Sequence, residues 1–319
     1  MAGAPKKIRA IDLFCGVGGS SWGASQAGVE IVAAFDAWEL AGRNHHANFP
    51  KARFYPGRLE DLDLDKTAND IGTVDLILAS PECTNHSPAR GNRPRSEDSK
   101  NTAFQVIRFA RKFKPTWIII ENVVSMRNWS RYDEFKDQLT AAKYQYREQV
   151  LDSSDFGVPQ KRRRLFLVCS LDGKPVPVRR HRGRKKYVKS ILNMNGKYQW
   201  SPLRQKGRAQ ATLERAKRGI SEVGNKAPFL IVYYGSDHAG GWQQLSRPLR
   251  TITTLDRFAL VKPTADGHVM RMLQVPELQS AMGMAGMSFE HGTRREKIKM
   301  IGNAVCPPVM QAVVEQLAV

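Results

Sequence analysis

Two residues that could share one reaction stand where apolar runs end in the first half of the sequence. Cys83 follows the apolar run 74–79, and Glu121 ends the next such run, "WIIIENV". Because the carboxyl ends of parallel strands meet at one edge of a sheet, the thiol and the carboxylate can meet over one substrate. The pair predicts a nucleophile assisted by a general acid. Taken singly, each would more often be structural, as a buried small side chain or a solvated loop end.

A Gly-rich turn predicts a nucleotide-like ligand at the same edge. "DLFCGVGG" places Gly16, Gly18 and Gly19 where the first strand turns into its helix, and Asp36 ends the second apolar run, "VEIVAAFD". Glycine lets the backbone approach a ligand, and a carboxylate after the second strand can hold ribose hydroxyls. Alone, such a turn also fits a dinucleotide, or a tight turn that binds nothing.

The elements that position these residues alternate between apolar runs and helical spacing. We expect strands within 8–15, 29–36, 73–80, 115–123, 145–156 and 162–170, and helices within 21–28, 38–49, 102–113 and 131–144. This rhythm predicts an α/β fold with a mainly parallel, Rossmann-like sheet. After Ser170 it breaks into a Pro-, Gly- and Arg-rich stretch. We expect one amphipathic helix within 208–219, and helical spacing again over 268–284 and 307–319.

Charge points to a polyanionic partner. The chain has 319 residues and a formal net charge of +20, and its sequence pI is about 10.0. Residues 174–226 hold 16 Lys or Arg against two acidic residues, a net of +14. Nucleic acid is the natural partner, because phosphate neutralisation releases counterions. A merely soluble or disordered basic segment ranks second, because aromatic residues such as Tyr198 and Trp200 are interleaved with the charges.

Several classes of protein are disfavoured. The four cysteines are far apart, without CxxC or metal-ligand spacing, so we expect neither a disulfide framework nor a metal site. The first residues lack the pattern of a secretory signal, and no window approaches the roughly 20 apolar residues that span a bilayer. We therefore expect no membrane partner and a cytoplasmic location, in a bacterium or in the bacterial host of a phage.

Six blocks together resemble a known family. "DLFCGVGG", "SPECTNHS", "ENV", "QKRRR", "RPLRTIT" and "IGNAVCPPV" occur in the order and near the separations of the signature blocks of bacterial or phage DNA (cytosine-5)-methyltransferases. The resemblance covers about 11–168 and 247–314. It implies an S-adenosylmethionine-dependent methyltransferase that flips a cytosine out of duplex DNA, in keeping with the need to reach a stacked base. It also implies a catalytic and cofactor-binding domain at 1–172, a small basic target-recognition domain at 173–264, and a returning segment at 265–319. We expect a monomer.

The resemblance also implies residue roles. Cys83 would attack carbon 6 of the base, Glu121 would hydrogen-bond to ring nitrogen 3, and Arg162 and Arg164 would face the base and its phosphates. The cofactor site would be lined by Phe14, Gly16, Gly18, Gly19, Asp36, Trp38, Leu59, Asn303 and Val305. The loop after the cysteine would close over DNA with Thr84, Ser87, Arg90 and Arg93.

Three positions depart from the family pattern. Glu82 stands where the family usually has proline, and Thr84 replaces a glutamine. An anion beside a thiol raises the thiol pKa, but it also attracts a positively charged sulfonium. Arg58 falls where the family generally has an acidic residue, and Glu60 or Asp61 could take over that role.

Three other functions stay open at this stage. An RNA cytosine methylase acting on transfer RNA would use the same chemistry. A catalytically silent nucleic-acid-binding protein would follow if Glu82 disables the thiol. A dinucleotide oxidoreductase would leave "ENV" and "QKRRR" without a role.

Overall fold

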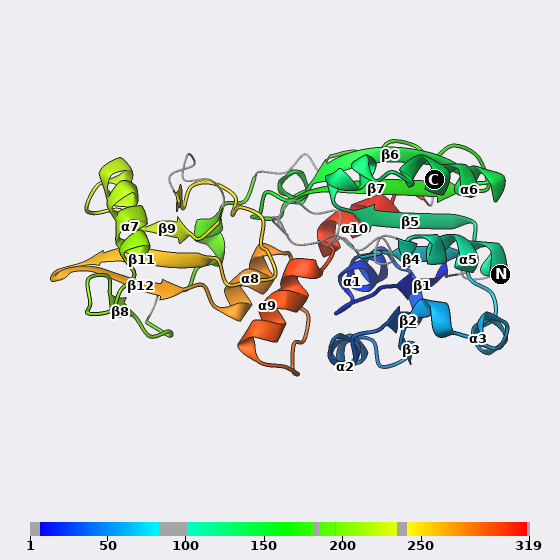
Figure 1. Ribbon diagram of the computed structural model, residues 1–319, viewed down its shortest axis with the longest axis horizontal. Coiled ribbons are helices and arrows are strands. Elements are labelled where there is room, and N and C mark those ends of the chain that lie inside the picture. The colour runs from blue at the N-terminus through cyan, green and yellow to red at the C-terminus, as the bar shows by residue number, and fades with distance from the viewer. Residues whose placement is uncertain (1–6, 83–100, 181–184, 195, 235–240, 318–319) are drawn as a thin grey trace, which may run out of the picture.

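The protein contains a large mixed sheet and a smaller antiparallel sheet, which lie at opposite ends of the molecule (Figure 1). The computed structural model describes residues 7–82, 101–180, 185–194, 196–234 and 241–317. Across these ranges, no helix is long and apolar enough to cross a membrane.

The large sheet has the strand order β3-β2-β1-β4-β5-β7-β6. The pairs from β3 to β5 are parallel, and β7 is antiparallel to both β5 and β6, which confirms the predicted mainly parallel sheet. All four residues of the β4 run "LILA" are buried, as expected for a strand covered on both faces. The strands are β1 (Arg9–Leu13), β2 (Glu30–Asp36), β3 (Arg53–Pro56), β4 (Leu76–Ala79), β5 (Trp117–Asn122), β6 (Gln145–Asp152) and β7 (Arg163–Ser170).

Alternate residues of the central strands feed two apolar clusters, one on each face of the large sheet. Leu76 and Leu78 belong to the cluster that includes α1 (Gly19–Gln26), α2 (Glu39–Asn48) and α10 (Pro307–Val314). Ile77 and Ala79 belong to the cluster that includes α3 (Leu64–Ile71), α5 (Phe104–Phe113) and α6 (Tyr132–Ala141). The sheet is therefore a central layer between two layers of helices.

Helices α1 and α10 approach each other closely because glycines face the contact. A Cβ built on Gly19 would lie 2.3 Å from the carbonyl oxygen of Val305, and one built on Gly23 would lie 2.3 Å from that of Pro307. Only a residue without a side chain permits this approach. The first helix and the C-terminal segment, almost 290 residues apart, thus form one packed unit.

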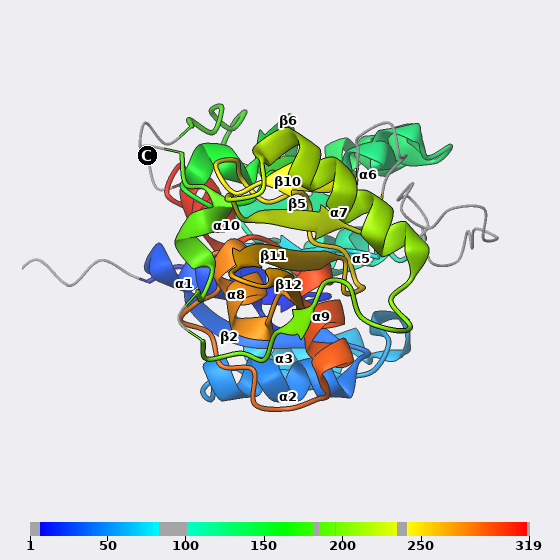
Figure 2. The same ribbon diagram turned by 90° about the vertical axis from the view of Figure 1, so that its left-hand side faces the viewer.

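The smaller sheet has the strand order β10-β9-β11-β12-β8, with antiparallel pairing throughout. Its strands are β8 (Ser201–Pro202), β9 (Phe229–Val232), β10 (Trp242–Gln244), β11 (Phe258–Thr264) and β12 (Gly267–Met272). Helix α7 (Gln210–Val223) lies across this sheet (Figure 2) and packs through Ala216 and Gly219, the latter against the Phe229 ring. The helix expected within 208–219 is confirmed.

The C-terminal part of the sequence differs from the expectation. The helical spacing over 268–284 is wrong at its start, because Gly267–Met272 forms strand β12, and only α8 (Val275–Ala281) is helical. The predicted division at 264/265 falls inside the β11–β12 hairpin, where Thr264 pairs with Gly267. The small sheet therefore continues past that point to Met272.

A buried ion pair joins the small sheet to the helices beside it. Arg271 on β12 donates to both carboxylate oxygens of Glu277 on α8, at 2.8 and 2.7 Å, and also to the carbonyl oxygen of Asn193. Its guanidinium lies 5.0 Å from the Tyr198 ring centroid and 4.9 Å from that of Trp200. Three chain segments thus meet at one arginine.

The sequence carries no prediction for strand β3, helix α3 and helix α9 (Arg294–Asn303), nor for strands β8 to β11 of the small sheet. Helix α9 begins with a capping box, in which Thr293 and Glu296 bond each other's backbone N–H groups. The short 3-10 turns are η1 (Leu59–Asp61), η3 (Val124–Asn128), η4 (Ser153–Phe156) and η5 (Val188–Ile191).

Candidate functional site

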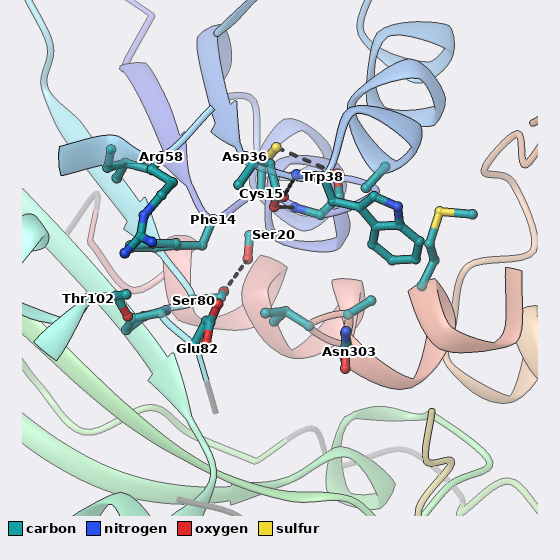
Figure 3. A pocket seen from close by; sticks show the side chains of 18 of the residues that line it. Phe14, Cys15, Ser20, Asp36, Trp38, Arg58, Ser80, Glu82, Thr102 and Asn303 are labelled. Carbon is teal, nitrogen blue, oxygen red and sulfur yellow. Dashed lines mark hydrogen bonds between the residues drawn. The ribbon is translucent and has the colours of Figure 1, made fainter. Parts of the chain in front are cut away.

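A cavity of about 750 Å³ lies at the carboxyl edge of β1, β2, β4 and β5, closed on one side by the end of α9 (Figure 3). It is lined by residues 14–16, 36–38, 57–60, 80–82, 299–300 and 303–305, with Ser20, Ala41, Thr102 and Glu121. Of the predicted cofactor residues, seven line it: Phe14, Gly16, Asp36, Trp38, Leu59, Asn303 and Val305. Residues from both ends of the chain therefore share one cavity.

Asp36 is fixed at the end of β2 by two backbone amides. The N–H of Gly16 donates to its Oδ2 and the N–H of Trp38 to its Oδ1, both at 2.8 Å. Burial raises the carboxyl pKa, the two amides oppose that rise, and the charge of Glu82 adds to it. Each oxygen keeps acceptor capacity, so the carboxylate can receive further hydroxyl donors from the cavity.

The Gly-rich turn has two structural roles, since part of it lines the cavity and part of it packs against neighbouring elements. Phe14 and Gly16, with φ of 58° and 53°, both face the cavity from left-handed backbone conformations. Gly18 and Gly19 do not line it. A Cβ on Gly18 would lie 2.8 Å from the His45 ring, so these two glycines allow the turn to pack against α2 and the C-terminal segment.

A buried polar cluster lies beneath this turn. Asp12 accepts hydrogen bonds from the N–H and the hydroxyl of Ser21, at 3.1 and 2.6 Å, and that hydroxyl lies 3.0 Å from Nε2 of His45. Burial raises the pKa of Asp12 to about 7 against the effect of the Ser21 bonds, and burial lowers the pKa of His45 to about 4. The cluster anchors the start of α1, on which the turn depends.

Leu59 is held in place from a neighbouring helix. Arg108 on α5 donates to the carbonyl oxygen of Leu59 at 2.8 Å and to that of Leu62 at 2.6 Å, which fixes the turn η1. Arg58 reaches Oε2 of Glu60 at 3.8 Å, and both side chains line the cavity. This wall thus carries charges of both signs beside a buried leucine.

Glu121 lies one residue before the end of β5, with its carboxyl group buried beside Arg164. The Nε of Arg164 lies 3.1 Å from Oε1 of Glu121. Burial raises the Glu121 pKa, and the charges of Arg164 and Arg162 oppose that rise. Burial thus favours the protonated form of this carboxyl group, which can donate a hydrogen bond, whereas the two guanidinium groups favour its charged form.

Arg162 lies behind the cavity instead of facing into it. Its guanidinium is 3% exposed and donates to the carbonyl oxygens of Ile252, Gly302 and Ala304, at 2.9–3.1 Å. These bonds fix the backbone on both sides of Asn303. The expectation that Arg162 faces the base and its phosphates is therefore replaced by a supporting position, because its donors are directed at backbone carbonyls.

Cys83 lies outside the described residues, as do Thr84, Ser87, Arg90 and Arg93. The chain that leads to it is described. The Asn122 side chain donates to the carbonyl oxygen of Pro81 at 3.0 Å, which ties the end of β4 to the end of β5. Glu82, the residue before the cysteine, lines the same cavity as Glu121.

The described cysteines are poor nucleophiles. Cys15, Cys169 and Cys306 are buried, and burial raises the pKa of each thiol, that of Cys306 to about 12. A thiol needs its thiolate form to attack, so the raised pKa disfavours each of these three as a nucleophile. No group of three or more potential metal ligands occurs in the part of the chain that the structure describes.

Several lining residues carried no sequence signal. Lys299 on α9 places its Nζ 4.3 Å from the Trp38 ring centroid, and Ser20 and Ser80 bring their hydroxyl oxygens to 3.5 Å. The two partners in each of these pairs are 60 or more residues apart in the sequence, so local sequence patterns do not show that they come together. A search for polar residues after each strand would have found Ser80 alone.

Curated proteins with similar sequences include bacterial type II methyltransferases. M.AgeI of Thalassovita gelatinovora is 32% identical over 177 residues, 53% of this chain and 41% of that protein. M.HgiDI of Herpetosiphon aurantiacus is 33% identical over 166 residues, 50% and 52% of the two chains. A human tRNA (cytosine(38)-C(5))-methyltransferase is 25% identical over 174 residues, 53% and 44% of the two chains. The matches thus span about half the length of these curated relatives.

Solved structures share the fold over almost the whole chain. A protein described as a DNA modification methyltransferase encoded within a prophage (E. coli) aligns with a TM-score of 0.70 at 16% identity, covering 98% of this chain and 99% of that one. A DNMT2 of Spodoptera frugiperda aligns with a TM-score of 0.69 at 17% identity, covering 98% and 100%. Residues 8–318 match the family described as C-5 cytosine-specific DNA methylase, so the chain belongs to this family, which uses S-adenosylmethionine as its methyl donor.

Proposed function

We propose that the protein transfers a methyl group from S-adenosylmethionine to carbon 5 of a flipped-out cytosine in duplex DNA, through a covalent adduct with Cys83. One observation carries the proposal. The buried carboxyl group of Glu121 shares a cavity with the anchored carboxylate of Asp36 and with the backbone that leads directly to Cys83. Acid, ribose-binding group and nucleophile are thus assigned to one edge of the sheet.

The cavity has the donor set that an adenosine-containing cofactor needs. Asp36 would receive the ribose hydroxyls, and the side chains of Phe14, Leu59 and Val305 supply apolar walls for a purine ring. Asn303 would close the cavity from the C-terminal side, held by the bonds of Arg162 to the residues around it. When bound, the cofactor supplies an electrophilic methyl group.

Glu121 and Cys83 would act on the base together. Carbon 5 of cytosine is a poor nucleophile until the thiolate of Cys83 adds to carbon 6 and makes the ring enamine-like. Glu121, which burial biases toward its protonated form, would donate to ring nitrogen 3 and stabilise the adduct, with Arg164 beside it. After methyl transfer, loss of the proton from carbon 5 and breakage of the sulfur–carbon bond restore the aromatic ring and the free thiol.

Duplex DNA is favoured by the separate basic segment. Helix α7 and strands β8, β9 and β10 of the small sheet lie between "QKRRR" and "RPLRTIT", strands β11 and β12 follow the second block, and residues 174–226 carry a net charge of +14. Such a segment suits phosphate contacts and groove readout, so we assign it target recognition. The type II methyltransferase relatives agree with a modification role in a bacterial cytoplasm, and that assignment is part of the proposal.

Transfer RNA is the second candidate, because one relative is named a tRNA (cytosine(38)-C(5))-methyltransferase. The two substrates are separated by measuring transfer of labelled methyl to duplex DNA and to transfer RNA, with Cys83→Ser as the inactive control. We expect the parent chain to label duplex DNA and not transfer RNA, and we expect Cys83→Ser to label neither. Bisulfite sequencing of DNA from expressing cells then reads the target sequence, and label confined to RNA, or no protected cytosine, would overturn the proposal.

A further inference from the structure

A second cavity, of about 660 Å³, is formed by α2, the edge strand β3 and the turn between them (Figure 1). Among the residues that the structure describes, none lines both this cavity and the cofactor cavity. The segment that contains α2 nevertheless contributes to both, because Trp38 and Ala41 face the cofactor cavity, whereas Gly42 and Arg43 face the second one. Small-molecule sites have volumes of about 300–1,000 Å³, so the second cavity is large enough for a ligand of that class.

Two walls of the second cavity are fixed by contacts with distant parts of the chain. The backbone N–H of His291 donates to Oδ1 of Asn44 at 3.0 Å, and Nδ2 of Asn44 donates to the carbonyl oxygen of His291 at 3.1 Å. On β3, Nη1 of Arg53 lies 3.2 Å from Oδ2 of Asp70, and its guanidinium lies 5.1 Å from the Tyr55 ring centroid. The walls that carry His291 and Arg53 are therefore in place before a ligand binds.

The floor of the second cavity is apolar and includes an aromatic ring. A Cβ built on Gly42 would lie 2.1 Å from Cζ of Phe54, so glycine allows this ring to lie directly against the helix. The Phe54 side chain is half-buried and lines the cavity, together with Pro50 and Pro56. A ring in this position offers a flat apolar surface on which a planar base can stack.

The rim of the second cavity carries more positive than negative charge. Arg43, Lys51 and Arg53 line it, against one carboxylate, that of Glu39. Because Arg53 already pairs with Asp70, the positive excess lies with the exposed side chains of Arg43 and Lys51. Arginine and lysine are the side chains that bind phosphate groups, by charge and by hydrogen bonds.

We propose that this second cavity binds a nucleotide, with the phosphate at Arg43 and Lys51 and the base against the Phe54 ring. The phosphate accounts for the cationic rim, and the base accounts for an apolar floor that a simple anion would not use. Two sources offer this chemistry, a free mononucleotide and one nucleotide of a longer strand. The inference does not depend on methyl transfer, because no lining residue of this cavity takes part in the proposed reaction.

The test is calorimetric titration of adenosine monophosphate into the full chain, with S-adenosylhomocysteine at saturation so that the cofactor cavity is filled. We expect binding that Lys51→Gln or Arg43→Gln weakens about five-fold, the effect of one screened unit charge at about 4 Å. Phe54→Leu should weaken binding of the nucleotide but not of inorganic phosphate. The matched control is Lys66→Gln, which removes the same charge from an exposed residue of α3 outside the cavity lining and should leave the affinity at the parent value.

Three results would overturn the inference: no detectable binding of adenosine monophosphate, an affinity unchanged in both Lys51→Gln and Arg43→Gln, or inorganic phosphate that binds as tightly as the nucleotide. The first two variants change exposed side chains, so we expect both to fold.

Titration of a single-stranded oligonucleotide and of a duplex, at fixed salt, distinguishes the two sources. If the nucleotide belongs to a longer strand, adenosine monophosphate competes with one of these polymers, and Lys51→Gln weakens that polymer more than Lys66→Gln does. If the nucleotide is free, the polymers and the mononucleotide bind independently. A parent chain that binds adenosine monophosphate in this way but methylates neither DNA nor RNA would support the second site and contradict the proposed function.

Discussion

Gly19→Ala tests whether the close approach of α1 to the C-terminal segment builds the cofactor cavity. The new Cβ would lie 2.3 Å from the carbonyl oxygen of Val305 and 3.1 Å from Cε of Met284. Ordinary contacts begin near 3.4 Å, so the segment at 305 must recede by about 1 Å. Overpacking of this kind costs about 1–3 kcal/mol, which outweighs the gain of up to about 1 kcal/mol that alanine brings to a helix interior.

The expected result has two parts. The melting temperature should fall by a few degrees, at about 2–4 °C per kcal/mol for a chain of this size class. S-adenosylmethionine binding, measured by calorimetry, should weaken about ten-fold, the equivalent of about 1.4 kcal/mol, because Val305 and Asn303 line the cavity.

Two further variants of α1 separate stability from cofactor binding. Gly23→Ala makes an equal clash with Pro307, but away from the cavity lining, so it should lower the melting temperature with a smaller loss of affinity. Gln26→Ala, on the exposed side of the same helix, should change neither. If Gly19→Ala melts and binds cofactor like the parent, the close approach has no part in shaping the cavity.

Three other substitutions probe buried groups. Because burial raises the Asp12 pKa to about 7, the folded chain holds a proton that the unfolded chain releases near pH 4, so this group's stabilisation is lost as pH rises from about 4 to 7. Asp12→Asn should therefore gain stability relative to the parent on going from pH 5 to 7.5, by about 1–3 kcal/mol in urea unfolding, and a constant difference would contradict the assignment. Arg162→Ala should lower the free energy of unfolding by about 3 kcal/mol, because three carbonyl oxygens lose their donor. The same variant should weaken cofactor binding in calorimetry. An unchanged cofactor affinity would show that these bonds do not hold the residues around Asn303. Glu277→Gln should lower the free energy of unfolding by about 3–5 kcal/mol in the same assay, because it leaves Arg271 without its carboxylate. The double change of Arg271 to Met and Glu277 to Leu should recover most of that loss. No recovery would contradict charge burial as the cause.

The central sheet could be predicted because its strands are short apolar runs that separate helical segments. β4 is buried at every position, and its run "LILA" carries no polar interruption. Strand β3 was missed because "RFYP" is short, exposed at both ends and at the edge of the sheet. Strand β12 was read as helical because Arg271 is buried next to Met270, and this breaks the alternation that marks a strand. The ion pair with Glu277 permits this burial, and because it is a tertiary contact it could not be predicted from the local sequence.

The site was predictable where a residue's role follows from its place at a strand end. Asp36 and Glu121 lie at the cavity as their positions at the carboxyl ends of β2 and β5 imply. The position of Arg162 was not predictable, because its acceptors lie 90 to 142 residues further along the chain. Nothing near "QKRRR" shows that they will meet. Lys299 was missed for the same reason, since its helix α9 was not expected.

The shared cavity also has a consequence for synthesis on the ribosome. Phe14 and Asp36 leave the ribosome early, but Asn303 and Val305, which complete the cavity, come nearly 290 residues later. At about 5–20 residues per second, the first strand β1 waits on the order of 15–60 s for the segment that closes the ligand-binding edge of its sheet. During that interval the Gly19 and Gly23 face of α1 has no partner helix. The cofactor cannot assist the early folding of the chain, and a nascent chain stopped before α9 should not bind it.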